Sequence, residues 1–180
     1  MSYRPITDTW ILCRSKVKYY GAYPAGFLHR ARQLLGVGLN DPVLHVCGGK
    51  IRDYPFRGFG TYDMTLDLDP ECKPDYWQDA NQPFPVYTIE SAGDGWPAIL
   101  IDRPYSEEDA EHYAPGKDKL PPPNLLIKNG IDAVRIGGKV GMLDYIWPAP
   151  PKNAVEVAVI AVYTGRNNRV RTFTVFERLT

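Results

Sequence analysis

A four-residue run, Asp102-Arg103-Pro104-Tyr105, combines residue types that could act on an amino group. It follows the apolar segment 96–101, which predicts a buried strand that ends at a carboxylate. Ligands of open α/β sheets bind outside the carboxyl ends of the strands, so we expect the run to form part of a site. Its carboxylate could accept N–H bonds, and its tyrosine could stack on a planar ring. The alternative is a strand exit whose aspartate only caps the next segment.

Two other predicted strands end in residues that suit a nucleoside ligand. Gly48 and Gly49 follow a short apolar strand, and paired glycines let a ligand approach the backbone closely. Asp67 and Asp69 end the next strand, at about the twenty-residue separation found in nucleoside-binding units, where an acid binds the ribose hydroxyls. His45 interrupts the first of these strands, and packing within the strand is the simpler explanation for it.

The rest of the chain alternates between helical and strand patterns. Apolar and polar periodicity predicts helices at residues 27–36, 106–113 and 125–134. The same patterns predict further strands at residues 73–80, 86–89 and 139–146, and an edge or surface segment at residues 6–12. Two β-rich runs, 155–163 and 170–177, are joined by glycine and asparagine, which predicts an antiparallel hairpin.

Length and composition indicate a soluble protein with a single domain, residues 1–180. No apolar run is long enough for a membrane helix, and the first residues lack the core of a secretion signal, so we expect a cytoplasmic protein. Cys13, Cys47 and Cys72 form no CxxC pair, which argues against a disulfide framework or a zinc site.

The formal net charge of zero disfavours strong, non-specific binding to nucleic acid, which depends on neutralising many phosphates. It still permits a local basic face. The candidate basic residues, which could equally be a solvated surface, are Arg4, Arg14, Lys16, Lys18, Arg166, Arg169 and Arg171.

The order of these motifs resembles class I S-adenosylmethionine (SAM)-dependent methyltransferases, over about residues 19–177. The run at Asp102 resembles the Asp-Pro-Pro-Tyr motif of enzymes that methylate adenine N6 or cytosine N4, with Arg103 in place of the first proline. The resemblance implies an α/β fold: a Rossmann-like, mostly parallel seven-stranded sheet with helices on both faces and a C-terminal antiparallel hairpin.

The resemblance also implies roles for individual residues. It implies that Asp102, Pro104 and Tyr105 are catalytic, and that Arg103 and Tyr105 contact the substrate. The residues implied to bind SAM come from five places along the chain. They are Tyr23 and Pro24 before the first strand of the fold; His45, Cys47, Gly48 and Gly49 in the glycine-rich first motif; Asp67 and Asp69, the acids expected at the ribose; Asp79 and Ala80 beside the adenine; and the catalytic acid Asp102. No metal is implied.

The expected activity is methyl transfer from SAM to an exocyclic amino group of a nucleic-acid base, with adenine N6 of DNA or RNA as the target. Two alternatives share the fold: an auxiliary subunit that binds the cofactor or nucleic acid without catalysis, and a methyltransferase for small molecules or nucleotides. We expect no separate target-recognition domain in 180 residues. Specificity would then come from short loops, a homodimer or a protein partner.

Overall fold

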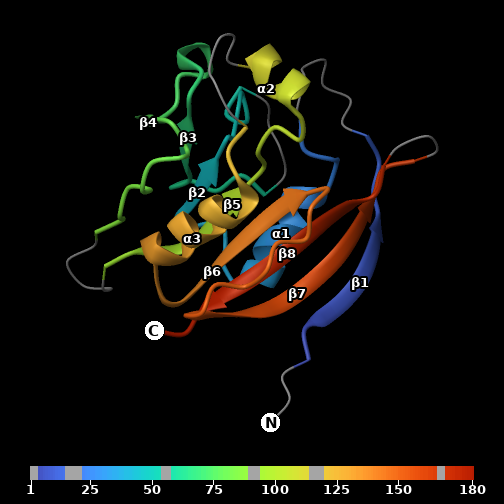
Figure 1. Ribbon diagram of the computed structural model, residues 1–180, viewed down its shortest axis with the longest axis vertical. Helices are drawn as coiled ribbons and strands as arrows, with labels where there is room; N and C mark the ends of the chain where they lie inside the picture. Colours follow the sequence, from blue (N-terminus) through green and yellow to red (C-terminus); the bar gives the residue numbers. More distant parts are fainter. Residues whose placement is uncertain (1–3, 15–21, 54–57, 89–93, 114–119, 166–168) are drawn as a thin grey trace.

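The computed structural model describes residues 4–14, 22–53, 58–88, 94–113, 120–165 and 169–180. Within them, eight strands form one mixed sheet in the order β1-β7-β8-β6-β5-β2-β3-β4 (Figure 1). The strands are β1 (Ile6–Ile11), β2 (Val43–Val46), β3 (Met64–Asp67), β4 (Tyr76–Trp77), β5 (Trp96–Ile101), β6 (Val134–Asp144), β7 (Ala154–Tyr163) and β8 (Arg171–Arg178). The helices are α1 (Phe27–Leu35), α2 (Glu107–Tyr113), α3 (Pro123–Ala133) and the short 3-10 helix η1 (Pro70–Cys72).

The centre of the sheet is parallel. Strands β4, β3, β2, β5 and β6 run in one direction, and β8 lies antiparallel between β6 and β7. The carboxyl ends of the five parallel strands therefore lie along one edge of the sheet, which we call the carboxyl edge. The predicted parallel sheet and C-terminal hairpin are confirmed in outline. The predicted number of seven strands is wrong, because β1 adds an eighth, parallel to β7.

Helices cover both faces of the sheet, as the sequence predicted. Buried side chains of α1 pack with Ala98 and Leu100 of β5, whereas those of α3 pack with Ile99 and Ile101. Successive strand residues point to opposite faces, so β5 contributes side chains to the core under α1 and to the core under α3. A strand that is covered on both faces has a continuous apolar sequence. The buried β5 thus fixes where Asp102 leaves the sheet.

Three predicted boundaries differ from the structure. Residues 86–88 form no strand, although a strand was predicted at residues 86–89; residue 89 lies outside the described part. Helix α3 ends at Ala133 and β6 begins at the next residue, whereas the sequence predicted a helix to residue 134 and a strand from residue 139. Gly137, with a φ of 76°, lies in a bulge where β6 has several residues opposite a single residue of β5.

Candidate functional site at the carboxyl edge

The catalytic motif predicted from the sequence lies at the end of β5. The backbone N–H of Asp102 donates to the carbonyl of Val46, 3.2 Å away, so the motif lies beside the end of β2. The hydroxyl of Tyr105 donates to Oδ1 of Asp102 at 2.5 Å, and Nη1 of Arg171 donates to the same hydroxyl at 3.1 Å. Asp102, Tyr105 and Arg171 therefore form a hydrogen-bonded chain that links the ends of β5 and β8.

Asp102 has an unusual electrostatic environment. Burial raises the pKa of its carboxyl group to about 7, although Arg171 and the Tyr105 hydroxyl oppose the rise; the negative charge of Asp144 adds to it. Near neutral pH this carboxyl group can therefore both accept and release a proton. A pKa close to the working pH is typical of acids and bases that act in catalysis.

Arg103 does not point to a substrate position. Its Nε donates to Oδ2 of Asp144 at 2.5 Å, and both side chains are almost completely buried. Asp144 also accepts from the backbone N–H groups of Tyr145 and Ile146, at 2.6 and 3.1 Å. The predicted contact between Arg103 and substrate is therefore not supported, because a buried guanidinium requires a carboxylate partner and has found one. The ion pair between Arg103 and Asp144 instead links the end of β5 to the end of β6.

Replacing Arg103 tests this structural role. We expect Arg103→Met to lower the free energy of unfolding by about 3–5 kcal/mol, because it leaves the carboxylate of Asp144 buried and unpaired. Urea denaturation measures the change. Lys128→Met is the control, since Lys128 pairs with Asp132 at the surface and its loss should cost below about 1 kcal/mol. Equal effects of the two substitutions would show that the buried pair does not hold the site together.

Sequence reasoning missed Tyr145, and it left Arg169 and Arg171 open between a local basic face and a solvated surface. The ring of Tyr145 lies 4.8 Å from that of Tyr105, and the guanidinium of Arg169 lies 5.6 Å from the Tyr145 ring centre. Arg171 lies similarly against Tyr105, at 5.9 Å. The signal in the sequence that could have identified Tyr145 is its position directly after Asp144, the acid that ends β6.

The glycine turn, residues 47–49, follows β2 and lies next to the catalytic motif. Cys47 and Gly49 have positive φ angles of 55° and 54°, so the chain turns sharply there. The N–H of Gly49 donates to Oδ2 of Asp67 at 2.9 Å, which joins the turn to the end of β3. Packing favours glycine at position 48, because a Cβ atom there would lie 3.2 Å from the Cβ of His45, a tight contact. The structure thus brings together three residues predicted to bind the cofactor: Cys47, Gly49 and Asp67.

The charges of three carboxylates act on the Cys47 thiol. Its pKa is raised, first by burial and then by the negative charges of Asp67, Asp102 and Asp79, whereas Arg103 opposes the rise. Burial also raises the pKa of Asp67. The predicted acids at the ends of β3, β4 and β5 are therefore close enough to influence one group. A positively charged ligand at this place would be attracted by the same carboxylates.

The other predicted acid and its neighbours have local partners. The carboxylate of Asp69 caps η1 by accepting from the N–H of Glu71 at 2.9 Å, which argues against a role in cofactor binding. Asp79 accepts from the N–H of Asn81 at 2.8 Å in the turn after β4. Ala80 is buried beside it. Asp79 and Ala80 therefore remain candidates for a place beside the site, whereas the Asp69 carboxylate bonds the backbone of η1.

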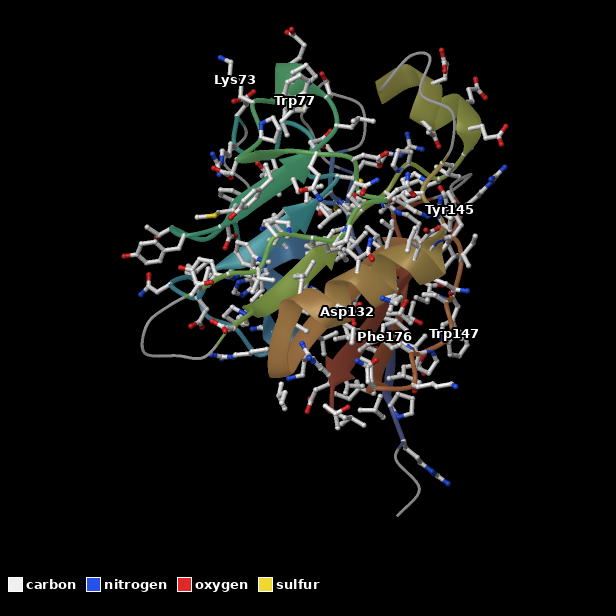
Figure 2. The ribbon with its side chains drawn as sticks, turned by 60° about the vertical axis from the view of Figure 1, so that its left-hand side comes forward. Lys73, Trp77, Asp132, Tyr145, Trp147 and Phe176 are labelled. Carbon is white, nitrogen blue, oxygen red and sulfur yellow. The ribbon has the colours of Figure 1, made fainter. Side chains whose placement is uncertain are left out.

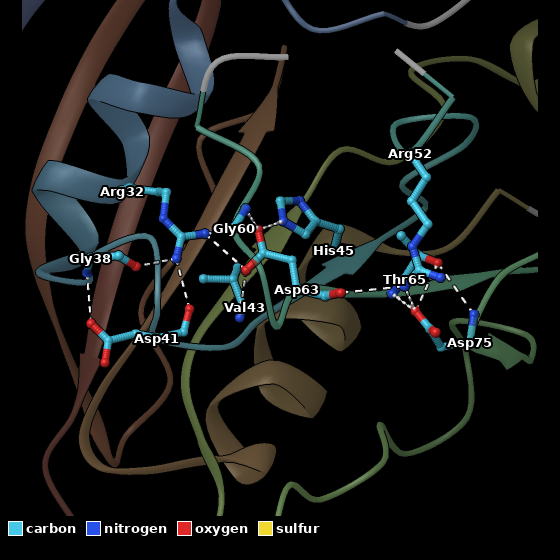
Figure 3. A network of polar contacts seen from close by, with 10 residues as sticks. All are labelled: Arg32, Gly38, Asp41, Val43, His45, Arg52, Gly60, Asp63, Thr65 and Asp75. Carbon is cyan, nitrogen blue, oxygen red and sulfur yellow. Dashed lines mark hydrogen bonds and ion pairs between the residues drawn. The ribbon is translucent and has the colours of Figure 1, made fainter. Parts of the chain in front are cut away.

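His45 lies in a buried polar network rather than at the cofactor position (Figure 3). Its Nε2 lies 3.0 Å from Oδ2 of Asp63. The same carboxylate accepts from Nη1 of Arg32 at 2.9 and 2.8 Å, and from the backbone N–H groups of Val43 and Gly60 at 3.1 and 2.7 Å. This network agrees with packing within the strand, the simpler explanation for His45, and gives no support to its implied cofactor role, because the pleat of β2 turns this side chain toward the α1 face.

Tyr23 and Pro24 also belong to the core. The Tyr23 ring is 2% exposed and stacks on Phe27 of α1, with ring centres 5.3 Å apart. Ala25 donates its N–H to the carbonyl of Cys13, which follows β1, so the segment lies near the carboxyl edge. A buried ring with this packing argues against the predicted direct contact with the cofactor. The segment supports the start of α1.

Within the described ranges, no group of three or more His, Cys, Asp or Glu side chains could hold a metal ion. No helix of the described chain is both long and apolar enough to cross a membrane.

No protein-family model and no curated protein match the chain in sequence. Solved structures match it in fold. TrmN from Thermus thermophilus has a TM-score of 0.57 and 16% identity; the match covers 87% of this chain and 49% of TrmN. An rRNA methylase from Streptococcus thermophilus has a TM-score of 0.51 and 9% identity, over 85% of this chain and 96% of the methylase. A protein from Streptococcus mutans, solved in complex with SAH, has a TM-score of 0.50 and 12% identity, over 83% and 95% of the two chains.

The chain has the Rossmann-like fold of methyltransferases. The predicted resemblance is thus confirmed at the level of fold, and its restriction to adenine N6 enzymes remains a prediction. The chain spans about half the length of TrmN.

Proposed function

We propose that this chain is a SAM-dependent methyltransferase that acts on an exocyclic amino group of a nucleic-acid base, adenine N6 in the first instance. One observation carries the proposal: the glycine turn with Asp67 and the run at Asp102 meet at the carboxyl edge. The fold similarity to an rRNA methylase and to a protein solved with SAH supports this choice of substrate and cofactor.

The residues around the glycine turn suit SAM as a ligand. Asp67 would accept from the ribose hydroxyls, and the turn at Asp79 and Ala80 would lie beside the adenine. The three carboxylates around Cys47 suit the positive charge of the sulfonium. When bound, SAM supplies an electrophilic methyl group.

Asp102 has the geometry of a residue that positions an amine. Tyr105 donates to its Oδ1, and among the described residues none donates to its Oδ2. That second oxygen would accept an N–H of the exocyclic amine, and the carbonyl of Arg103 would accept the other. As the nitrogen gains positive charge, Asp102 stabilises it and takes its proton. The ring of Tyr105, held by Asp102 and Arg171, would lie against the base.

SAM binding is the first test of the proposal. We expect SAM to raise the melting temperature of the full chain, since a ligand at about 100 times its Kd stabilises a protein by about 2.7 kcal/mol. Differential scanning fluorimetry with SAM, SAH and ATP measures the effect. ATP shares the adenosine but is anionic, so the cluster of acids should disfavour it. The absence of any stabilisation by millimolar SAM or SAH would refute the proposal.

The raised pKa of Asp102 predicts a pH dependence. Below its pKa of about 7 the carboxyl group is protonated and cannot accept from the amine, so kcat/KM for methyl transfer should rise with pH and level off above about 7. Arg171→Gln removes a positive charge that lowers this pKa, so its profile should be displaced to higher pH. Initial rates with labelled SAM between pH 5.5 and 9 measure both profiles. Superimposable, flat profiles would contradict the role of Asp102.

The raised pKa of Asp102 also makes the free energy of unfolding depend on pH. Because the folded-state pKa of Asp102 is raised, the folded protein holds this proton more tightly than the unfolded chain. The resulting contribution to stability is present below about pH 4 and is lost as the pH rises through about 7.

An auxiliary subunit of the same fold is the second candidate. It is favoured by the Tyr105 hydroxyl, which already occupies Oδ1 of Asp102, and by His45, which the resemblance implied to bind SAM but which bonds to Asp63 in the core. Stabilisation by SAM without methyl transfer to DNA, RNA or nucleotides would identify this function. Transfer to nucleotides alone would identify a small-molecule enzyme.

A further inference from the structure

Exposed aromatic residues extend from the catalytic motif along the chain after β6. Tyr145, Ile146 and Trp147 are 39%, 48% and 60% exposed, and we call residues 145–147 the aromatic segment. Its first ring contacts Tyr105, and its last side chain lies further down the molecule (Figure 2). The segment is therefore a continuation of the proposed active site, and none of the roles described so far uses it.

The charged groups beside the rings of Tyr105 and Tyr145 favour an anionic ligand. Asp144 is neutralised by its ion pair with Arg103, whereas Glu156, which accepts from Nε1 of Trp147 at 2.6 Å, keeps its negative charge at the far end of the segment. Arg169 and Arg171 lie against tyrosine rings, and within the described chain neither forms an ion pair with a carboxylate. Arg171 is held by the Tyr105 hydroxyl and lies near the negative charge of Asp102, so Arg169 is the cation placed to meet a ligand. A guanidinium stacked on an aromatic ring can also extend a base stack.

Acidic residues determine the side from which a polyanion can approach. The first turn of α2 contains Glu107, Glu108 and Asp109, directly after the catalytic motif. Figure 2 shows Tyr145 between α2 and Trp147. Phosphates would be repelled by the acids of α2 and attracted by Arg169 beside Tyr145, so a strand would pass Tyr145 and reach the Trp147 ring with its phosphates away from Glu156.

We propose that the aromatic segment and Arg169 bind an unpaired nucleic-acid strand, with the bases next to the target base stacked on Tyr145 and Trp147. This inference rests on the nucleic-acid substrate of the proposed function. Stacking accepts any base, and Arg169 neutralises the adjacent phosphate. An unpaired strand fits because an exocyclic amine becomes reachable only when its base leaves the duplex.

Binding of fluorescein-labelled 15-nucleotide RNA and DNA single strands, and of the matching duplexes, tests the inference by fluorescence anisotropy. We expect Tyr145→Ala and Trp147→Ala each to weaken single-strand binding about 5- to 100-fold, the effect of losing a base–aromatic stack. We expect Arg169→Ala to reduce the slope of log K against log salt by about 0.7, the value for one phosphate contact with a single strand.

Trp77→Ala is the matched control. Trp77 is 71% exposed and its indole N–H also has an acceptor, the carbonyl of Leu68, but it lies on β4 at the far edge of the sheet. This variant should bind the strand within about twofold of the unaltered chain, because no base would stack at that edge. Equal losses for Trp77→Ala and Trp147→Ala, unchanged binding by Trp147→Ala, or a preference for the duplex would overturn the inference.

The melting temperature with SAM, measured on the same variants, separates this inference from the proposed function. A chain that SAM stabilises and that binds no oligonucleotide overturns the strand site and leaves the methyltransferase proposal standing. A chain that binds the strand through Tyr145 and Trp147 without stabilisation by SAM supports the strand site and refutes the proposed function.

Discussion

Asp102→Asn should reduce the rate of methyl transfer by about 10²- to 10³-fold or more while the fold is retained. The substitution keeps the shape of the side chain and removes the negative charge that positions the amine and takes its proton. It also removes the group whose pKa is raised to about 7, so the remaining activity should lose its dependence on pH in that range. Single-turnover transfer from labelled SAM measures the rate.

The control for Asp102→Asn is Asp132→Asn, because Asp132 is an exposed residue of α3 paired only with Lys128 at the surface. Its rate should stay within about twofold of the original, as for most surface substitutions. An unchanged rate in Asp102→Asn, or an equal loss in both variants, would remove the catalytic assignment.

Asp63→Ala should cause a large loss of stability, about 3–5 kcal/mol, because it leaves the buried guanidinium of Arg32 without its carboxylate. Burial by itself raises the pKa of Asp63, but hydrogen bonds from His45, Gly60 and Arg32 outweigh it, and the pKa is lowered. A lowered pKa means that this stabilisation is present above about pH 4 and is lost as the pH falls below that value. Urea denaturation at pH 7 and at acidic pH measures both effects.

Asp132→Ala is the control for Asp63→Ala, and it should change the free energy of unfolding by less than about 1 kcal/mol. If Asp63→Ala changed stability no more than this control, the network in Figure 3 would not be the structural support that its burial implies.

The sequence was sufficient to predict the elements with strong periodicity. The apolar run of β5 located Asp102, and the predicted helix at residues 27–36 matches α1 to within one residue, because burial on defined faces leaves a direct trace in the order of residues. The eighth strand was harder to predict. β1 is almost entirely exposed, with a single buried side chain, so nothing in its pattern distinguishes an edge strand from a surface segment.

The partners of polar residues could not be predicted from the sequence, because they come from distant parts of the chain. Arg103 looked like a substrate contact until Asp144, 41 residues away, proved to be its partner. His45 was assigned by its place in a motif, and its partner Asp63 lies outside that motif. The hydrogen bond from Arg171 to Tyr105 spans 66 residues. Such contacts depend on the sheet order, which no local pattern contains.

Nucleoside mass spectrometry tests the central claim most directly. Single-stranded RNA and DNA would be incubated with the full chain and SAM, digested to nucleosides, and searched for methylated products. Our account predicts N6-methyladenosine or its deoxy form with the original chain, and background levels with Asp102→Asn. Methylation only at a ring carbon or a ribose oxygen, or no methylated nucleoside although SAM binds, would contradict it.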